Sequence, residues 1–305
     1  LNGGTLGASA DWVTARPITM VSTSTVDTTG GSISLNGAIS GAGDLNITGG
    51  KTVVLGGTNS FTGATLVTGN STVRIGNGAL HGSDITLASG STIGAGSLAT
   101  PGTGLANNVT AANGSNSTYR ISPTASDKLD VLDFNVDTSH TVTIVPVGTV
   151  AANDVFEVLT YNTLSGAGYA GINVVSGNPR LTVAKEPDDG VSLDVRVVAF
   201  DAVIWKGTDG TNPGLWDVNT TVNWQTDSTL VASTFLNNDV VIFDDSASTT
   251  NVTLAGSISP ATVTFANNSL NYSLSGAGIG GSGGILKTGT GTVVLGNANT
   301  FSGTA

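Results

Sequence analysis

Carboxylates are the side chains of this chain best suited to catalysis, because Asp and Glu together number 21 against 10 Lys and Arg. Glycoside hydrolysis needs two carboxyl groups that flank the scissile bond, roughly 5–10 Å apart. The two glutamates, Glu157 and Glu186, belong to no visible acidic constellation. The sequence therefore gives no sign of a glycosidase, and we expect a protein that is not an enzyme.

The aspartates gather in three segments. The first set alternates with Leu132, Phe134 and Val136, which is typical of the solvent face of a half-buried strand. The second is followed by Gly190 and predicts a hairpin turn. The three segments contain Asp127, Asp130, Asp133 and Asp137; Asp188 and Asp189; and Asp239, Asp244 and Asp245.

Two oxygen-rich groups are candidate calcium sites. The third aspartate segment is one, and Asp209 with Asp217 and Asn219 is the other, but neither has the ligand spacing of a calcium loop. His81 and His140 are isolated and the chain has no Cys, which argues against a transition metal. We expect no cofactor, and a structural Ca²⁺ at one of the two oxygen-rich groups is the alternative.

Nucleophile and phosphate motifs are also missing. Serine is abundant, but no G-x-S-x-G sequence frames a nucleophile. Lys287-Thr288 follows a glycine run, yet the glycine spacing differs from a phosphate loop and no helical pattern follows. We interpret these glycines as tight corners between strands.

Three of the four tryptophans, Trp205, Trp216 and Trp224, fall within a short segment. Exposed indole rings can stack on the apolar face of a sugar, so these residues are candidate glycan contacts. The alternative, which we favour, is that they plug the end of a β-structure and cover its strand edges.

Short strands must position all of these residues. Apolar residues alternate with small polar ones in Thr72–Ile75 and Thr141–Val145, no helical periodicity is sustained, and the chain is 39% apolar. The fold class is therefore all-β. The first 118 residues predict strands at Ile18–Val21, Ser32–Leu35, Leu45–Thr48, Thr52–Leu55, Thr65–Thr68, Thr72–Ile75, Asp84–Leu87 and Ser91–Ile93.

Loops this short cannot hold crossover helices, so an antiparallel sandwich and a parallel β-helix remain. The glycine-rich corners favour the parallel β-helix, or β-solenoid. Composition and the length of the alternating segments divide the chain into three parts. Residues 1–118 form solenoid coils, and residues 119–200 form a β-rich module that is either sandwich-like or a broadened end of the solenoid. Residues 201–305 begin a new unit, whose first segment is rich in Trp.

The end of the chain repeats its beginning. Thr52–Gly56 recurs as Thr292–Gly296, an offset of 240 residues (292 − 52 = 240). Upstream, the motif SGAG at Ser40 recurs at Ser275, an offset of 235 (275 − 40 = 235), which predicts five extra residues in the second copy. A repeat of this kind is typical of units that stack on their neighbours.

Charge narrows the range of partners. The net charge of −11 and the scattered Lys and Arg argue against nucleic acid. No apolar run reaches about 20 residues, so this segment predicts no membrane contact. We find no signal peptide and expect a fragment or a processed product.

The C-terminal motif GGILKTGTGTVVLGNANTFSG resembles the autotransporter-associated β-strand repeat of large bacterial surface proteins. The resemblance implies a parallel β-helix on the bacterial cell surface, outside the cell, with motif positions that are structural. These positions are Gly41, Gly43, Leu55, Asn59, Phe61 and Gly63 in the first copy, and Gly289, Gly291, Leu295, Asn299, Phe301 and Gly303 in the second.

We therefore expect a structural stalk, fibre or adhesin shaft that pairs head-to-tail with copies of itself or with adjacent repeats. A carbohydrate-binding adhesin module built around the tryptophans is the alternative, with surface glycans as partners. A polysaccharide-degrading β-helix enzyme is the third possibility.

Overall fold

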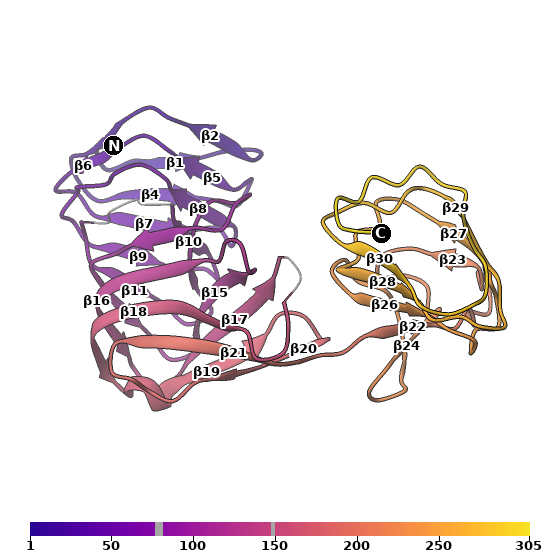
Figure 1. The fold of residues 1–305 in the computed structure, drawn as a ribbon. Coiled ribbons are helices and arrows are strands. Elements are labelled where there is room, and N and C mark those ends of the chain that lie inside the picture. Colours follow the sequence, from indigo (N-terminus) through magenta and orange to yellow (C-terminus); the bar gives the residue numbers. More distant parts are fainter. Residues whose placement is uncertain (77–81, 148–149) are drawn as a thin grey trace. The chain divides into compact units, whose positions relative to one another are not determined.

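The computed structural model describes residues 1–76, 82–147 and 150–305, which form two compact units (Figure 1). His81 lies outside the described residues. Each unit is a β-solenoid, and the prediction of an all-β, parallel solenoid is confirmed. Unit 1 comprises Leu1–Val145, Ala152–Asn178 and Thr182–Val198, and unit 2 comprises Pro146–Ala151, Pro179–Leu181 and Ala199–Ala305.

The first sheet of unit 1 is a parallel ladder that gains one strand with each coil. Such stacking satisfies the backbone N–H and C=O groups of every coil that has two neighbours. The parallel strands are β1 (Thr5–Gly7), β4 (Ser24–Asp27), β7 (Leu45–Thr48), β9 (Thr65–Val67), β11 (Ile85–Leu87), β14 (Asn108–Ala111), β16 (Lys128–Val136) and β18 (Val155–Gly166).

The second sheet of unit 1 stacks in the same way. Its strands, in chain order, are β2 (Trp12–Thr14), β5 (Ile33–Leu35), β8 (Thr52–Leu55), β10 (Thr72–Ile75), β12 (Thr92–Ala95), β15 (Ser115–Ile121), β17 (His140–Pro146) and β19 (Ile172–Ser176). A short third sheet pairs β3 (Ile18–Met20) with β6 (Ile39–Gly41), and β13 (Thr103–Leu105) joins β16. Strands β15 to β19, within residues 119–200 except for the start of β15, thus continue the ladders that begin in residues 1–118.

The coils of unit 1 widen along the chain. Asn46 lies beside Leu66 and Leu66 beside Thr86, so a coil takes 20 residues there (66 − 46 = 20; 86 − 66 = 20). The next coils take 24, 25 and 30 residues (110 − 86, 135 − 110 and 165 − 135). Alternate residues point inward and stack in columns, such as the fully buried column of Val26, Ile47, Val67 and Leu87.

A hairpin closes the last coil of unit 1. It consists of β20 (Leu181–Lys185) and β21 (Ser192–Phe200), and β21 runs antiparallel to β18. Leu193, Val195 and Val197 of β21 are fully buried. The predicted turn at Asp188-Asp189-Gly190 is confirmed, since Asp189 accepts hydrogen bonds from the N–H groups of Val191 and Ser192 at 2.9 and 2.8 Å. A 3₁₀ turn, η1 (Gly168–Gly171), precedes β19.

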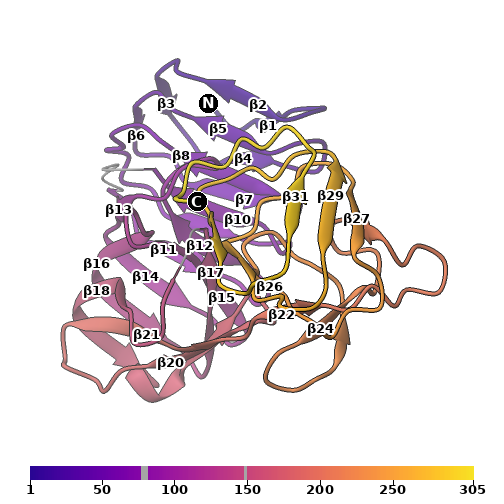
Figure 2. The same ribbon diagram turned by 45° about the vertical axis from the view of Figure 1, so that its right-hand side comes forward.

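Unit 2 begins with antiparallel strands and continues as parallel coils (Figure 2). One sheet orders its strands as β25 (Ala232–Ser233), β24 (Trp224–Thr226), β22 (Val203–Trp205), β26 (Val240–Phe243), β28 (Thr262–Phe265) and β30 (Gly284–Lys287). The other stacks β23 (Leu215–Trp216), β27 (Asn251–Leu254), β29 (Tyr272–Gly276) and β31 (Val293–Leu295). β24 pairs antiparallel with both β22 and β25.

The sequence repeat recurs as the same hydrogen bond in both units. The side-chain oxygen of Asn59 accepts from the N–H of Ile39 at 3.0 Å, and that of Asn299 accepts from Ile279 at 2.8 Å. Both pairs keep the offset of 240 (279 − 39; 299 − 59). The expected five extra residues are therefore wrong. The two SGAG motifs are not equivalent, because Ser40 lies in β6 and Ser275 lies in β29.

Candidate functional site

The three clustered tryptophans form the core of unit 2 at its first coil. Trp224 packs edge-on against Trp205 and Trp216, with ring centroids 4.9 and 5.2 Å away. Phe235 and Phe243 complete the cluster, and the three indoles are at most 1% exposed. Sugar stacking requires an exposed ring face, and these rings present none.

Asn223 holds the polar side of this cluster and was not singled out from the sequence. Its side-chain N–H₂ donates to the carbonyls of Asn212 and Leu215, both at 2.8 Å, and its oxygen accepts from the N–H of Asp209 at 2.8 Å. The fully buried amide thus ties the loop of residues 209–215 to β24. The feature of the sequence that could have pointed to Asn223 is its position directly before Trp224.

The aspartates weighed as calcium ligands accept hydrogen bonds from backbone N–H groups. Asp245 accepts from Asn268, Ser269 and Leu270 at 2.9–3.0 Å, and Asp209 accepts from Thr211 and Asn212 at 3.0 and 2.9 Å. These bonds favour the ionised form and lower the pKa of both carboxyls. Within the described ranges, no three His, Cys, Asp or Glu residues are arranged to hold a metal ion.

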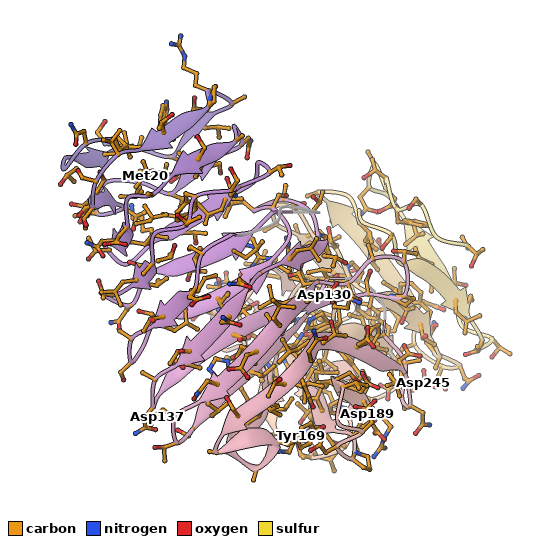
Figure 3. All side chains as sticks on the ribbon, turned by 90° about the vertical axis from the view of Figure 1, so that its left-hand side faces the viewer. Met20, Asp130, Asp137, Tyr169, Asp189 and Asp245 are labelled. Atoms are coloured by element: carbon orange, nitrogen blue, oxygen red, sulfur yellow. The ribbon has the colours of Figure 1, made fainter. Side chains whose placement is uncertain are left out.

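The first aspartate segment divides between surface and interior. Asp130 and Asp133 are half-buried and accept from Thr160 and Ser165, and Asp137 is exposed. Asp130, Asp137 and Asp189 lie apart from one another on unit 1 (Figure 3). The prediction of a solvent-facing position is wrong for Asp127, which is fully buried. Two arginines explain this burial.

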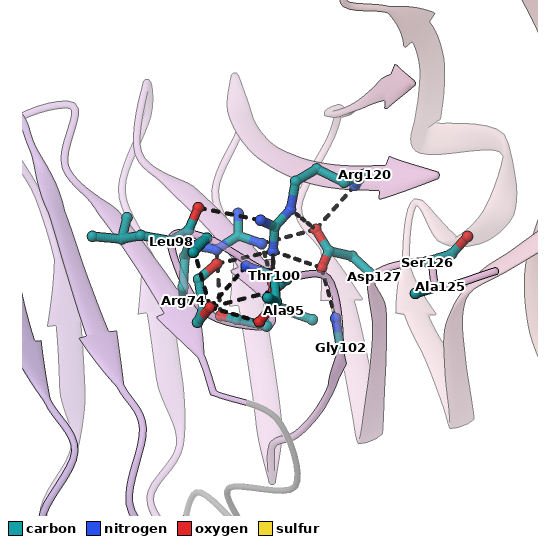
Figure 4. A network of polar contacts seen from close by, with 12 residues as sticks. Arg74, Ala95, Leu98, Thr100, Gly102, Arg120, Ala125, Ser126 and Asp127 are labelled. Atoms are coloured by element: carbon teal, nitrogen blue, oxygen red, sulfur yellow. Dashed lines mark hydrogen bonds and ion pairs between the residues drawn. The ribbon is translucent and has the colours of Figure 1, made fainter. Parts of the chain in front are cut away.

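Asp127 accepts hydrogen bonds from two guanidinium groups (Figure 4). Arg74 Nη2 and Arg120 Nε both lie 2.8 Å from its Oδ2, and Arg120 Nη2 lies 3.0 Å from its Oδ1. The N–H groups of Gly102 and Arg120 also donate to it, each at 3.0 Å. Burial lowers the pKa of the Arg74 guanidinium, and Asp127 opposes that shift. The three side chains form an ionic cluster in which both carboxylate oxygens of Asp127 accept hydrogen bonds.

This cluster secures the loop at which the coil first widens. Arg120 donates to the carbonyls of Ser97 and Thr100 at 2.9 and 2.7 Å, and to that of Leu98 at 3.3 Å. These hydrogen bonds fix an exposed loop of the first coil that is four residues longer than its predecessor (24 − 20 = 4). Arg74 and Arg120 are therefore structural, and their roles follow from contacts that are distant in the sequence.

His140 is the buried histidine of unit 1. Its Nδ1 lies 2.9 Å from Ser115 Oγ, its Nε2 lies 2.6 Å from Ser117 Oγ, and its ring packs edge-on against Phe134 at 5.2 Å. A neutral imidazole donates from one nitrogen and accepts at the other, so it satisfies both contacts. Burial lowers the pKa of His140 to about 4.

Unit 1 is expected to lose stability in mild acid because of His140. Between the ordinary His pKa of about 6.5 and the folded value of about 4, the unfolded chain binds a proton that the folded chain excludes. Stability then falls by up to about 1.4 kcal/mol for each unit of pH lost. Urea unfolding followed by hydrogen-exchange mass spectrometry measures this. A His140→Leu variant that retains the full acid slope would contradict the assignment.

Asp239 gives the stability of unit 2 the opposite dependence on pH. It is fully buried, lies 3.5 Å from Arg180 Nε and accepts from the N–H of Leu236 at 2.8 Å. Burial nevertheless raises the pKa of Asp239 to about 6, so the folded state takes up a proton before the unfolded state does. From about pH 7.5 to about pH 5, unit 2 should gain about 1 kcal/mol of unfolding free energy. Tryptophan fluorescence measures it, and Asp239→Asn should abolish the gain.

A groove of about 630 Å³ lies on the side of unit 1. Its floor is largely apolar, and Leu132 and Val191 are more than half exposed. Asp130 is the one carboxylate among the described lining residues, so a pair for glycoside hydrolysis does not arise from them. The lining comprises Gly82, Leu105, Ala106, Asn107, Asp130, Val131, Leu132, Thr160, Tyr161, Asn162 and Val191.

The repeat-motif residues build the coil in both units. Leu55 and Phe61 are fully buried, whereas Leu295 is 39% exposed and Phe301 is partly buried against the core of unit 2. A Cβ at Gly63 would lie 2.2 Å from the carbonyl oxygen of Gly43, so only glycine lets these coils approach. Gly303 stands in the same position against Gly283. The motif's Gly41 has a positive φ of 107°, and Gly289 and Gly291 lie between β30 and β31.

Asn59→Ala should lower the free energy of unfolding of unit 1 by about 1–3 kcal/mol, because the N–H of Ile39 would lose its buried acceptor. Urea unfolding monitored by hydrogen exchange over residues 33–55 measures the change. Thr62→Ala, at the exposed position just before the last motif residue, Gly63, is the control and should have little effect. Equal losses from both variants would disprove the role of Asn59.

Comparison with known proteins adds no relative. No protein-family model matches the chain, and no curated protein matches it. Within the described ranges, no helix has the length and apolar character needed to cross a membrane. The sheets and coils define the chain as a parallel β-solenoid protein.

Proposed function

We propose that this chain is a non-enzymatic structural segment of a large bacterial surface protein, in which it forms part of a stalk, fibre or adhesin shaft outside the cell. The observation that carries the proposal is the 240-residue recurrence of one coil, with equivalent hydrogen bonds at Asn59 and Asn299. The second copy also resembles the autotransporter-associated β-strand repeat in its sequence.

The physical properties of the units support a mechanical role. Their parallel ladders place backbone hydrogen bonds between successive coils, and aliphatic columns fill the interior. The net charge of −11 opposes lateral association between copies. Contacts with adjacent repeats or with other copies, end to end, are the interactions that such a shaft requires.

Carbohydrate binding through Trp205, Trp216 and Trp224 is not proposed, because their rings are buried. The lateral groove offers the remaining polar and apolar surface for a ligand, but its described residues contain no aromatic ring that is exposed. Tyr161 is 4% exposed, and its hydroxyl donates to the carbonyl of Ser192.

Antibodies raised against the 305-residue chain test the proposal. Intact cells that produce the natural protein should be labelled, and external protease should remove the label. Labelling that appears only after the cells are permeabilised would contradict a surface role. An activity assay of the purified chain on polysaccharides is the companion experiment, and sustained cleavage would contradict the non-enzymatic role.

A further inference from the structure

Each unit has one capped end and one open coil. In unit 1 the hairpin β20–β21 covers the last coil, and in the first coil Trp12, which lies beside the fully buried Ile33, is 40% exposed. In unit 2 the order is reversed. The antiparallel strands β24 and β25 and the tryptophan cluster close its first coil, whereas in the last coil the inward-facing Ile285 and Val293 are only partly buried and Leu295 is 39% exposed.

The open coil of unit 2 has an equivalent in the interior of unit 1. With the constant offset of 240, β30 and β31 correspond to β7 and β8. In unit 1 the next coil covers β7 with β9 and β8 with β10, and Leu55 is fully buried. Its equivalent, Leu295, is 39% exposed. The exposed surface of Leu295 is therefore the surface that a further coil would cover.

We infer that the folding module of this repeat is a solenoid closed at both ends, made of residues 201–305 followed by a segment with the sequence pattern of residues 66–200. The open coil of unit 2 is then the docking surface for a coil of the β9–β10 type. Within the described ranges, the two sheets that hold the coils of unit 2 consist of β22–β31 alone. The inference holds whether or not the protein lies on a cell surface.

The side chains of the two coils suit each other. Val53 and Leu55 lie beside Val73 and Ile75 in unit 1, and the open coil offers Val293 and Leu295 at the same places. Lys287 stands where unit 1 has Ile47. Its ammonium group turns back to the carbonyl of Gly289, which leaves the aliphatic stem for packing. Every strand of the acceptor coil thus has a matching inward residue or stem.

Extending the full chain tests the inference. Residues 66–200 are appended directly after Ala305, and Trp12→Phe in both proteins leaves Trp205, Trp216 and Trp224 as reporters of unit 2. If the appended segment completes the module, the urea m-value of the tryptophan transition should roughly double, because m follows the surface exposed on unfolding. The Tm of that transition should rise by about 10 °C or more.

A matched control carries Val67→Asp and Val73→Asp in the appended copy only, which puts charges into the first new coil. Its tryptophan transition should return to that of the 305-residue chain. An extended chain whose m-value and Tm equal those of the 305-residue chain would overturn the inference. So would sedimentation showing that the 305-residue chain already self-associates and that Val293→Asp abolishes this, since a second copy would then occupy the open coil.

Discussion

Asp127→Ala should lower the free energy of unfolding of unit 1 by about 3–5 kcal/mol. The substitution leaves the buried guanidinium group of Arg74 and the partly exposed one of Arg120 close together without their shared carboxylate. It also removes the acceptor of the Gly102 N–H. Because domains of this size are stable by only about 5–15 kcal/mol, a large part of the stability is lost. Urea unfolding with hydrogen-exchange mass spectrometry over residues 92–121 measures the change.

Asp137→Ala is the control for this prediction, since Asp137 belongs to the same aspartate segment and is exposed. It should change stability by less than about 0.5 kcal/mol. Asp127→Asn keeps the shape of the side chain and loses its charge, so its cost should lie between the two. If Asp127→Ala unfolds within about 1 kcal/mol of the natural chain, the ionic cluster does not stabilise the widened coil.

Strands could be predicted from the sequence where inward and outward residues differ in polarity. Leu45–Thr48, Thr52–Leu55 and Thr72–Ile75 were predicted at their observed bounds. The first strand, Thr5–Gly7, was missed because it has a single large apolar residue. Alternation marks a strand only when at least two inward positions are apolar.

The site residues were harder to predict because their partners are distant in the sequence. Asp127 is paired with Arg74, 53 residues away, and with Arg120, seven residues away across the turn between β15 and β16. The alternating pattern alone does not separate its carboxylate from the exposed one of Asp137. Repeat register posed a similar problem. The SGAG motifs at Ser40 and Ser275 are identical in sequence but lie in different strands. The Ile39–Asn59 and Ile279–Asn299 hydrogen bonds show that the offset of 240, found in the sequence for Thr52 and Thr292, also holds in this part of the repeat.

Trp224→Ala should unfold unit 2 while unit 1 stays folded. Truncating a buried Trp costs about 3–5 kcal/mol, and the edge-on contacts with Trp205 and Trp216 add about 0.5–1.5 kcal/mol each. Trp224 also forms the cross-strand pair with Trp205 that aligns β24 with β22. Hydrogen exchange should therefore show rapid labelling of residues 203–295 and unchanged protection of residues 24–136.

The conservative variant and an exposed tryptophan supply the controls. Trp224→Phe keeps most of the ring packing and should cost less than Trp224→Ala, and Trp12→Ala removes a side chain that is already 40% exposed. Unit 2 that keeps its protection in Trp224→Ala would contradict the tryptophan core. Because the predicted effect is loss of folding, weaker glycan binding by Trp224→Ala would not by itself identify a sugar contact. That interpretation requires a variant in which unit 2 is shown to remain folded.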